Sequence, residues 1–115
     1  MSKRNGKARV PKDKFRYVRC QVEPGMFREE WLVYFNAVDP TDPQRTIRVQ
    51  SLVDSRSVIG IRGTPKRKNP AEGLLRVTFV EQKAGFAWIV LPQPAVPVGE
   101  NVLVHKEALE QEAGV

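Results

Sequence analysis

From residue 15 onward, the chain is a series of short runs in which apolar and polar side chains alternate, and each run ends at Pro, Gly, Asp or Asn. In residues 15–22, for example, Val18, Cys20 and Val22 occupy every second position. A period of two is typical of antiparallel strands that bury one face, and the 3.6-residue period of helices is nearly absent. The pattern therefore predicts a protein made of β-strands.

The alternation predicts about six or seven short strands separated by turn-forming residues. Residues 23–25 suit a type II turn, and the two prolines of residues 39–43 lack the amide donor that a strand ladder needs, which predicts a loop there. Residues 30–38 are apolar on both faces and fit a central strand. Residues 106–112 have the Ala, Leu and Glu content of a short C-terminal helix. The expected strands are residues 15–22, 30–38, 46–53, 57–61, 74–80, 86–91 and 102–105.

So many short strands in so few residues must close or stack to protect their edges, as a small barrel or a compact sandwich does. We expect an all-β fold, and within it a small closed or partly open antiparallel barrel that is SH3-like or OB-like. The pattern leaves the strand order open. Residues 14–115 are expected to form this single β-barrel domain. Residues 1–13 are rich in like charges and poor in large apolar side chains, which predicts a disordered basic tail.

Positive charge is concentrated in two segments. Of the 19 Lys and Arg residues, eight fall in residues 1–19 and four in residues 62–68, and these segments carry net charges of +7 and +4. Because the whole chain carries +6, the remaining residues together carry −5. Clustered cations gain affinity for a polyanion by releasing its condensed counterions, so this distribution favours a nucleic-acid partner.

The chain offers little chemistry for catalysis or metal binding. It has one His, His105, which we expect to be a half-exposed structural residue, and one Cys, Cys20, which we expect to be a buried thiol, with a reactive thiol as the alternative. These two cannot supply a soft tetrahedral zinc site, and Asp39 and Asp42 fit no calcium-loop spacing. The sequence also lacks a phosphate-binding glycine loop. We therefore expect no enzyme activity, no metal and no cofactor.

The sequence contains no apolar run long enough to span a membrane, and the basic N-terminus is not followed by the apolar run of a secretory signal. The single cysteine is consistent with a reducing compartment. We therefore expect a cytoplasmic protein with no membrane partner.

The leading hypothesis is a non-catalytic protein that binds DNA or RNA by gripping the phosphate backbone. The contacts are expected from the basic tail, from the first strand and from a basic loop at residues 62–70, whose Gly and Pro content favours an exposed backbone. Such contacts give affinity with little sequence specificity. The candidate residues are Lys3, Arg4, Lys7, Arg9, Lys12, Lys14, Arg16, Arg19, Arg62, Lys66, Arg67 and Lys68.

Two aromatic residues near the start of the first strand are candidates for base stacking. If the register that buries Val18 extends back to residue 15, Phe15 and Tyr17 face outward, where their rings could stack on unpaired bases. Alternatively, a bulge between Tyr17 and Val18 turns both rings into the core. Trp31 and Trp88 lie in apolar strands and are expected in the core, with a stacking platform as the alternative.

A rival hypothesis from another class is a protein-interaction or accessory module that docks on a larger assembly through a sheet edge or an apolar loop. Met26 and Phe27 follow the predicted turn at residues 23–25, where apolar residues are unusual. We expect them to plug the end of the barrel. The alternative is an exposed patch for a protein partner or for a second copy of the chain in a homodimer.

Overall fold

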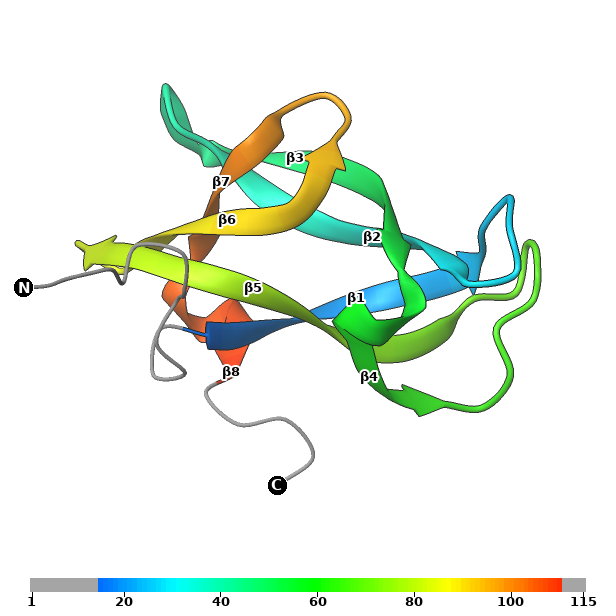
Figure 1. The fold of residues 1–115 in the computed structure, drawn as a ribbon. Helices are drawn as coiled ribbons and strands as arrows, with labels where there is room; N and C mark the ends of the chain where they lie inside the picture. Colours follow the sequence, from blue (N-terminus) through cyan, green and yellow to red (C-terminus); the bar gives the residue numbers. More distant parts are fainter. Residues whose placement is uncertain (1–14, 111–115) are drawn as a thin grey trace, which may run out of the picture.

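The computed structural model describes residues 15–110, and these form an almost all-β structure in which the only helical segments are two short 3₁₀ turns, η3 (Ser55–Ser57) and η4 (Lys106–Ala108) (Figure 1). The predicted all-β fold is confirmed. The described part of the chain contains eight strands, whereas the sequence predicted about six or seven. They are β1 (Phe15–Pro24), β2 (Glu30–Asp39), β3 (Asp42–Asp54), β4 (Val58–Arg62), β5 (Ala71–Lys83), β6 (Phe86–Ala95), β7 (Gly99–His105) and β8 (Leu109–Glu110).

Five of these strands close into an antiparallel barrel. β1 and β2 form a hairpin, and β5, β6 and β7 form a meander in which each strand pairs with the next. The hairpin joins the meander on both sides, because β1 pairs with β5 from Phe15↔Thr78 to Val22↔Ala71, and β2 pairs with β7 at Val38↔Leu103. The order around the barrel is therefore β1, β2, β7, β6, β5 and back to β1.

Three further strands extend the barrel wall. β3 pairs with β2 along almost its whole length, β4 pairs with β5, and β8 pairs with β1 at Tyr17 and Val18. β1 therefore has β5 along one side. The other side of β1 pairs with β8 at Tyr17 and Val18, and with β2 from Gln21 onward.

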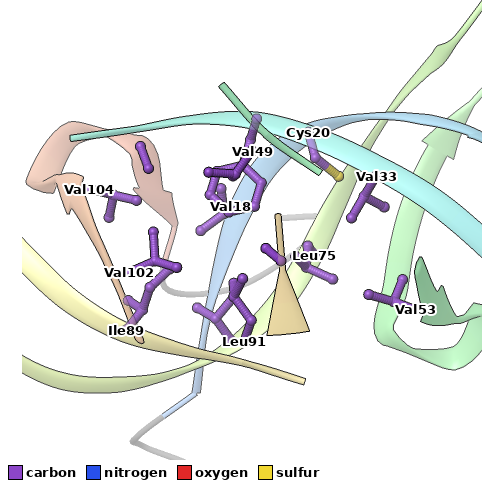
Figure 2. Packing of buried hydrophobic residues seen from close by; sticks show 14 of the residues in the cluster. Val18, Cys20, Val33, Val49, Val53, Leu75, Ile89, Leu91, Val102 and Val104 are labelled. Carbon is purple, nitrogen blue, oxygen red and sulfur yellow. The ribbon is translucent and has the colours of Figure 1, made fainter. Parts of the chain in front are cut away.

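The barrel interior is filled by aliphatic side chains that β1, β2, β5, β6 and β7 contribute at alternate positions, together with residues of β3 (Figure 2). β-branched residues dominate because they pack well on a pleated surface. Full burial of one Val or Leu side chain contributes about 1.5–3 kcal/mol, so this cluster is the main source of stability. Its fully buried members include Val18, Val22, Val33, Val49, Val53, Leu75, Val77, Ile89, Val102 and Val104.

Cys20 belongs to this cluster. Its side chain is 6% exposed, and its thiol donates to the backbone carbonyl of Gly73 over a sulfur–oxygen distance of 3.5 Å. Burial raises the pKa of the Cys20 thiol to about 12, because a thiolate would lose its hydration there. The predicted buried thiol is confirmed.

β2 is a central strand, as predicted, since it pairs with β1, β3 and β7. Trp31 at its start is half buried and packs against the core. Trp88 is half buried on the outer face, between the buried residues Ala87 and Ile89, so its expected place in the core is wrong. His105 at the end of β7 is exposed, and its ring centroid lies 5.2 Å from that of Phe86.

Met26 and Phe27 do not plug the barrel. Their side chains are 78% and 70% exposed, so that prediction is wrong and the alternative of an exposed patch describes them. The turn between β1 and β2 is closed by backbone hydrogen bonds from the amide of Gly25 to the carbonyl of Glu30, and from the amide of Glu30 to the carbonyl of Phe27, each at 3.1 Å. These bonds fix a tight turn whose tip projects from the barrel end.

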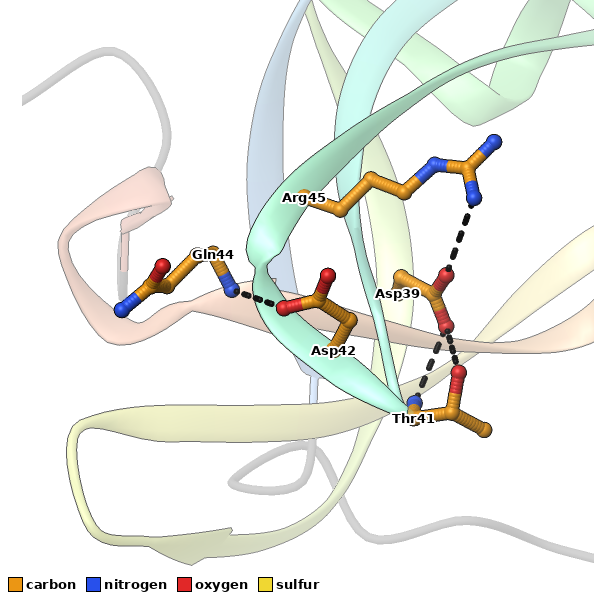
Figure 3. A network of polar contacts seen from close by, with 5 residues as sticks. All are labelled: Asp39, Thr41, Asp42, Gln44 and Arg45. Carbon is orange, nitrogen blue, oxygen red and sulfur yellow. Dashed lines mark hydrogen bonds and ion pairs between the residues drawn. The ribbon is translucent and has the colours of Figure 1, made fainter.

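The loop predicted for residues 39–43 is shorter than expected. β2 continues to Asp39 and β3 begins at Asp42. The register shifts between the pairs Val38↔Thr46 and Asp39↔Asp42, so Pro43 lies in a bulge and has no partner in the ladder. Both aspartates stabilise this turn (Figure 3). The Asp39 carboxylate accepts hydrogen bonds from the amide (2.9 Å) and hydroxyl (2.7 Å) of Thr41, which lower the pKa of Asp39. Asp42 accepts from the amide of Gln44 at 3.3 Å.

The predicted C-terminal helix is wrong for residues 106–110, and residues 111 and 112 lie outside the described range. Lys106–Ala108 form the 3₁₀ turn η4, after which Leu109–Glu110 pair with β1 as β8. The physical reason is tertiary. Leu109 packs against the barrel core, and the unpaired edge of β1 accepts the strand, which outweighs a weak helix propensity over so few residues. Within residues 15–110, no helix is long and apolar enough to cross a membrane.

Candidate nucleic-acid interface

Six of the predicted cationic contacts lie outside the described residues, at positions 3–14. They are Lys3, Arg4, Lys7, Arg9, Lys12 and Lys14. The structure describes the other six candidates, the two aromatic residues at the start of β1, and the end of the barrel wall to which the tail is attached.

The tail leads into one end of β1, and the basic loop lies beside the other end. The tail precedes Phe15, and the loop at residues 63–70 leads into Ala71, which pairs with Val22 near the other end of the strand. In Figure 1 this loop, between β4 and β5, lies at the same end as the turn between β1 and β2. β1 has 10 residues and is about 30 Å long. A polymer that contacts the loop and the start of β1, where the tail begins, would follow the barrel wall along β1.

The basic loop is exposed, as predicted. Lys66 and Asn69 exchange two backbone hydrogen bonds of 3.2 and 2.9 Å, which present Arg67 and Lys68 at the tip of a tight turn. Lys68 has a φ of 67° and so lies in the left-handed region. Among the described residues, no ion pair involves a cation of this loop or Arg62.

The start of β1 presents its two aromatic rings on the outer face. The pairing with β5 continues without interruption from Phe15 to Val22, so the alternative of a bulge after Tyr17 is wrong. Phe15 and Tyr17 are both half buried. The guanidinium of Arg76 lies over the Phe15 ring, 4.8 Å from its centroid, so cation and ring already form a stacked pair.

Arg16 is placed differently from Arg19. It occupies the register of the buried residues, is half buried, and holds its guanidinium 4.8 Å from the centroid of the Phe79 ring. Its side chain thus covers the end of the core, whereas Arg19 is exposed on the outer face. Arg16 is therefore a poorer candidate for a phosphate contact than its position in the basic cluster suggests.

A pocket of about 540 Å³ opens in the outer barrel wall where β1 and β2 diverge. The two strands are paired from Pro24↔Trp31 to Gln21↔Tyr34, and beyond that point β1 continues toward β8 while β2 continues toward β7. We call this cavity the wall pocket. The apolar residues among those that line it are Val18, Cys20 and Phe35, which are buried, and Leu74 and Ala108, which are half buried.

A row of side chains crosses four strands at the wall pocket. Arg62 of β4 is opposite Glu72 of β5, which is opposite Gln21 of β1, which is opposite Tyr34 of β2. Neighbouring strands are about 4.8 Å apart, so the row is about 14 Å long. The side chains all line the wall pocket, and Arg19 lines it too. The fold thus brings together two predicted residues, Arg19 and Arg62, that are 43 positions apart in the chain.

Arg48 of β3 completes the rim, and the charge pattern of the sequence did not identify it. Its guanidinium lies 5.5 Å from the centroid of the Tyr34 ring and donates to the side-chain oxygen of Asn36 at 3.4 Å and to that of Gln21. The only sequence signal is an Arg at a polar position of an alternating strand, which is also how a solvated surface residue looks. Arg76 was missed for the same reason, and Tyr34 was missed because it lies in a run that is apolar on both faces.

Two carboxylates also line the wall pocket. The Glu110 carboxylate forms an ion pair with the Arg19 guanidinium at 2.5 Å, and this contact raises the pKa of Arg19. Glu72 is the cross-strand neighbour of Arg62. Tyr34 donates to the Glu23 carboxylate at 3.4 Å, and burial and that carboxylate raise the pKa of Tyr34, so the phenol stays protonated at neutral pH. The rim thus mixes three guanidiniums with two carboxylates and two amides.

The described residues contain no group of three or more His, Cys, Asp or Glu side chains placed to hold a metal ion. Searches against protein-family models, curated proteins and solved structures found no match for this chain.

Proposed function

We propose that this chain is a non-catalytic nucleic-acid-binding protein that holds the phosphate backbone along the outer wall of its barrel. The observation that supports this proposal most directly is the gathering of Arg19, Arg48 and Arg62 around one pocket with an aromatic residue, Tyr34, in its rim. Guanidinium groups bind phosphate oxygens in a planar, bidentate geometry, and aromatic rings stack on bases.

The distribution of charge along β1 supports the same proposal. The basic loop continues the cationic rim beyond Arg62 at one end of the strand, and the basic tail is attached at the other. Between them, the outer face carries Phe15, Arg76 and Arg19. A polyanion that lies along β1 would meet Arg76 near the start of the strand and Arg62 with the basic loop at its other end, and each neutralised phosphate would release counterions.

The proposal is tested by fluorescence anisotropy with labelled DNA and RNA oligonucleotides at several salt concentrations. Two double variants remove cations from the interface, Lys66→Gln with Lys68→Gln in the loop, and Arg48→Gln with Arg62→Gln at the wall pocket. Each should weaken binding and reduce the slope of log affinity against log salt by roughly 0.7–0.9 for every phosphate that the variant no longer neutralises.

The matched control is Lys83→Gln with Lys106→Gln. These lysines are exposed, lie near the hairpin between β5 and β6, and line neither the wall pocket nor the basic loop. Removing them changes the net charge by the same amount and should leave the slope nearly unchanged. An equal reduction for control and interface variants would mean that only overall charge matters, and this would contradict the proposed interface.

A second candidate function is a protein-interaction module, which the exposure of Met26 and Phe27 favours. Two large apolar side chains at the tip of one turn are candidates for contact with a protein partner or a second copy of this chain. Sedimentation velocity over a range of protein concentrations would detect self-association. A Met26→Ser, Phe27→Ser variant that abolishes it would support this function.

A further inference from the structure

We propose that the wall pocket receives one unpaired base, so that the nucleic acid bound along β1 is single-stranded. This inference rests on the proposed function and assigns a part of the ligand to a cavity within the interface. The carboxylates of Glu72 and Glu110 in its lining disfavour a phosphate inside the cavity, and the apolar side chains of Leu74 and Ala108 favour a base there.

A phosphate is a poor occupant for the pocket itself. Glu72 and Glu110 line the cavity, and Glu110 already neutralises Arg19 through the 2.5 Å ion pair. Moving an anion into a partly enclosed space beside two carboxylates is unfavourable. The cations that remain at the rim are Arg48 and Arg62, on opposite sides of the opening. The charges therefore favour phosphates at the rim and an uncharged group inside.

The shape and chemistry of the cavity suit a base. Its lining includes the half-buried apolar residues Leu74 and Ala108, against which a flat ring can bury part of its face. The rim offers hydrogen-bonding groups of both kinds. The carboxylates of Glu72 and Glu110 can accept hydrogen bonds from an exocyclic amino group of a base, as carboxylates do from cytosine. The side-chain oxygens of Gln21 and Asn36 accept from Arg48, and their NH₂ groups can donate to a base.

Tyr34 and Arg48 form a stacking platform beside this cavity. The guanidinium lies 5.5 Å from the ring centroid, and it is held there by its hydrogen bonds to Asn36 and Gln21. The Tyr34 hydroxyl is held in turn by Glu23. Unpaired bases stack on aromatic rings and on guanidinium planes alike. In a duplex each base is paired and stacked on its neighbours, so it cannot enter such a pocket unless it is first extruded.

The test compares three labelled ligands of equal length by fluorescence anisotropy with the full chain. They are a single-stranded DNA, the same backbone with abasic sites in place of all bases, and a duplex. The variants are Tyr34→Leu, which removes the ring, and Tyr34→Phe, which keeps it. Trp88→Leu is the matched control, since Trp88 is a half-buried aromatic residue of the outer face that does not line the pocket. Thermal melting verifies that each variant folds.

If a base occupies the pocket, the single strand binds more tightly than the abasic strand and the duplex. Tyr34→Leu should weaken single-strand binding by about fivefold to 100-fold, while abasic binding, Tyr34→Phe and Trp88→Leu stay within about twofold of the native values. Equal binding of single and abasic strands, together with no effect of Tyr34→Leu, would overturn the inference and leave the proposed function standing. If no nucleic acid binds even at low salt, the proposed function fails, and the inference fails with it.

Discussion

At the level of single residues, the proposed interface depends on side chains whose neighbours are distant in sequence. Arg48 is an ordinary polar residue of β3 until β2 and β1 bring Tyr34, Asn36 and Gln21 beside it. Arg16 shows the opposite case. It belongs to the basic cluster of the sequence, yet its register turns it toward Phe79 and the end of the core. Charge in the sequence therefore pointed to the region of the proposed interface and not to all of the residues that the proposal assigns to it.

Gly73 shows how tightly single positions of the wall are packed. It is buried in β5 between β1 and β4, and a Cβ atom there would lie 3.0 Å from Val22 Cγ2 and 3.1 Å from Val58 Cγ1. Both neighbours are core residues. We therefore expect Gly73→Ala to lower the free energy of unfolding by about 1–3 kcal/mol. Urea denaturation measures this, with the exposed Gln82→Ala in the same strand as a control expected within about 0.5 kcal/mol of the native protein.

Cys20 should make stability depend on pH in the alkaline range. Its pKa is about 12 in the folded protein against an ordinary value of 9.0, so below pH 9 the thiol is protonated in both states. Above that, the unfolded chain releases the proton and the folded chain keeps it, which favours unfolding. Between pH 9 and 12 the thiol should therefore cost up to about 1.4 kcal/mol per pH unit.

This cost is measured as the difference in free energy of unfolding between the native protein and Cys20→Ala at each pH, which cancels the titration of other groups. The difference should be constant below pH 9 and should shift in favour of the alanine variant above it. A difference that stays constant throughout this range would show that the thiol is solvated in the folded protein.

At the level of secondary-structure elements, the alternation of side chains identified most strands, and the errors lie at their ends. The chain beyond β7 was expected to be helical, but it adds β8 to β1, because an unpaired strand edge and a core contact for Leu109 are available there. The turn between β2 and β3 is shorter than two prolines suggested, because a bulge accommodates Pro43. Neither the edge nor the bulge can be recognised before strand pairing is known.

The turn between β1 and β2 allows an element-level prediction. Because Met26 and Phe27 are exposed and the turn is closed by backbone hydrogen bonds, Met26→Ser with Phe27→Ser should change the free energy of unfolding by no more than about 0.5 kcal/mol. Trp31→Ala in the adjacent start of β2 serves as the contrast, since Trp31 packs against the core. If the serine variant is destabilised by more than about 2 kcal/mol, these residues are buried in solution, for example in a dimer.

At the level of the whole molecule, Phe15, which follows the tail, and the end of β1 beside the basic loop are about 30 Å apart. The tail and the loop should therefore contribute to binding independently when the ligand is long enough to reach both. With an oligonucleotide of about twenty nucleotides, the reductions in salt slope from a tail variant and a loop variant should add.

This prediction is measured with Lys3, Arg4 and Lys7 changed to Gln in the tail, with Lys66 and Lys68 changed to Gln in the loop, and with both sets combined. A ligand of about four nucleotides serves as the control, because it is too short to reach both segments, so the combined variant should show no more than the larger of the two single effects. Additive effects with the short ligand would mean that the tail folds back to the loop, contrary to binding along β1.

The fold class, the buried register and the positions of the cationic segments follow from local sequence pattern. A period of two depends only on which face of a strand is buried, and Val18, Cys20 and Val22 display it without reference to any partner strand. Charge clustering is likewise a local property. This is why the barrel, the buried thiol and the exposed basic loop were all predictable.

The choice of neighbouring strands, and with it the site, follows from tertiary packing and could not be predicted. Arg62, Glu72, Gln21 and Tyr34 form one row because β4, β5, β1 and β2 pair in that order. The wall pocket exists because β1 and β2 diverge after Gln21↔Tyr34. Strand pairing is a long-range choice among many registers of similar local energy, and the packing of the whole barrel selects one of them.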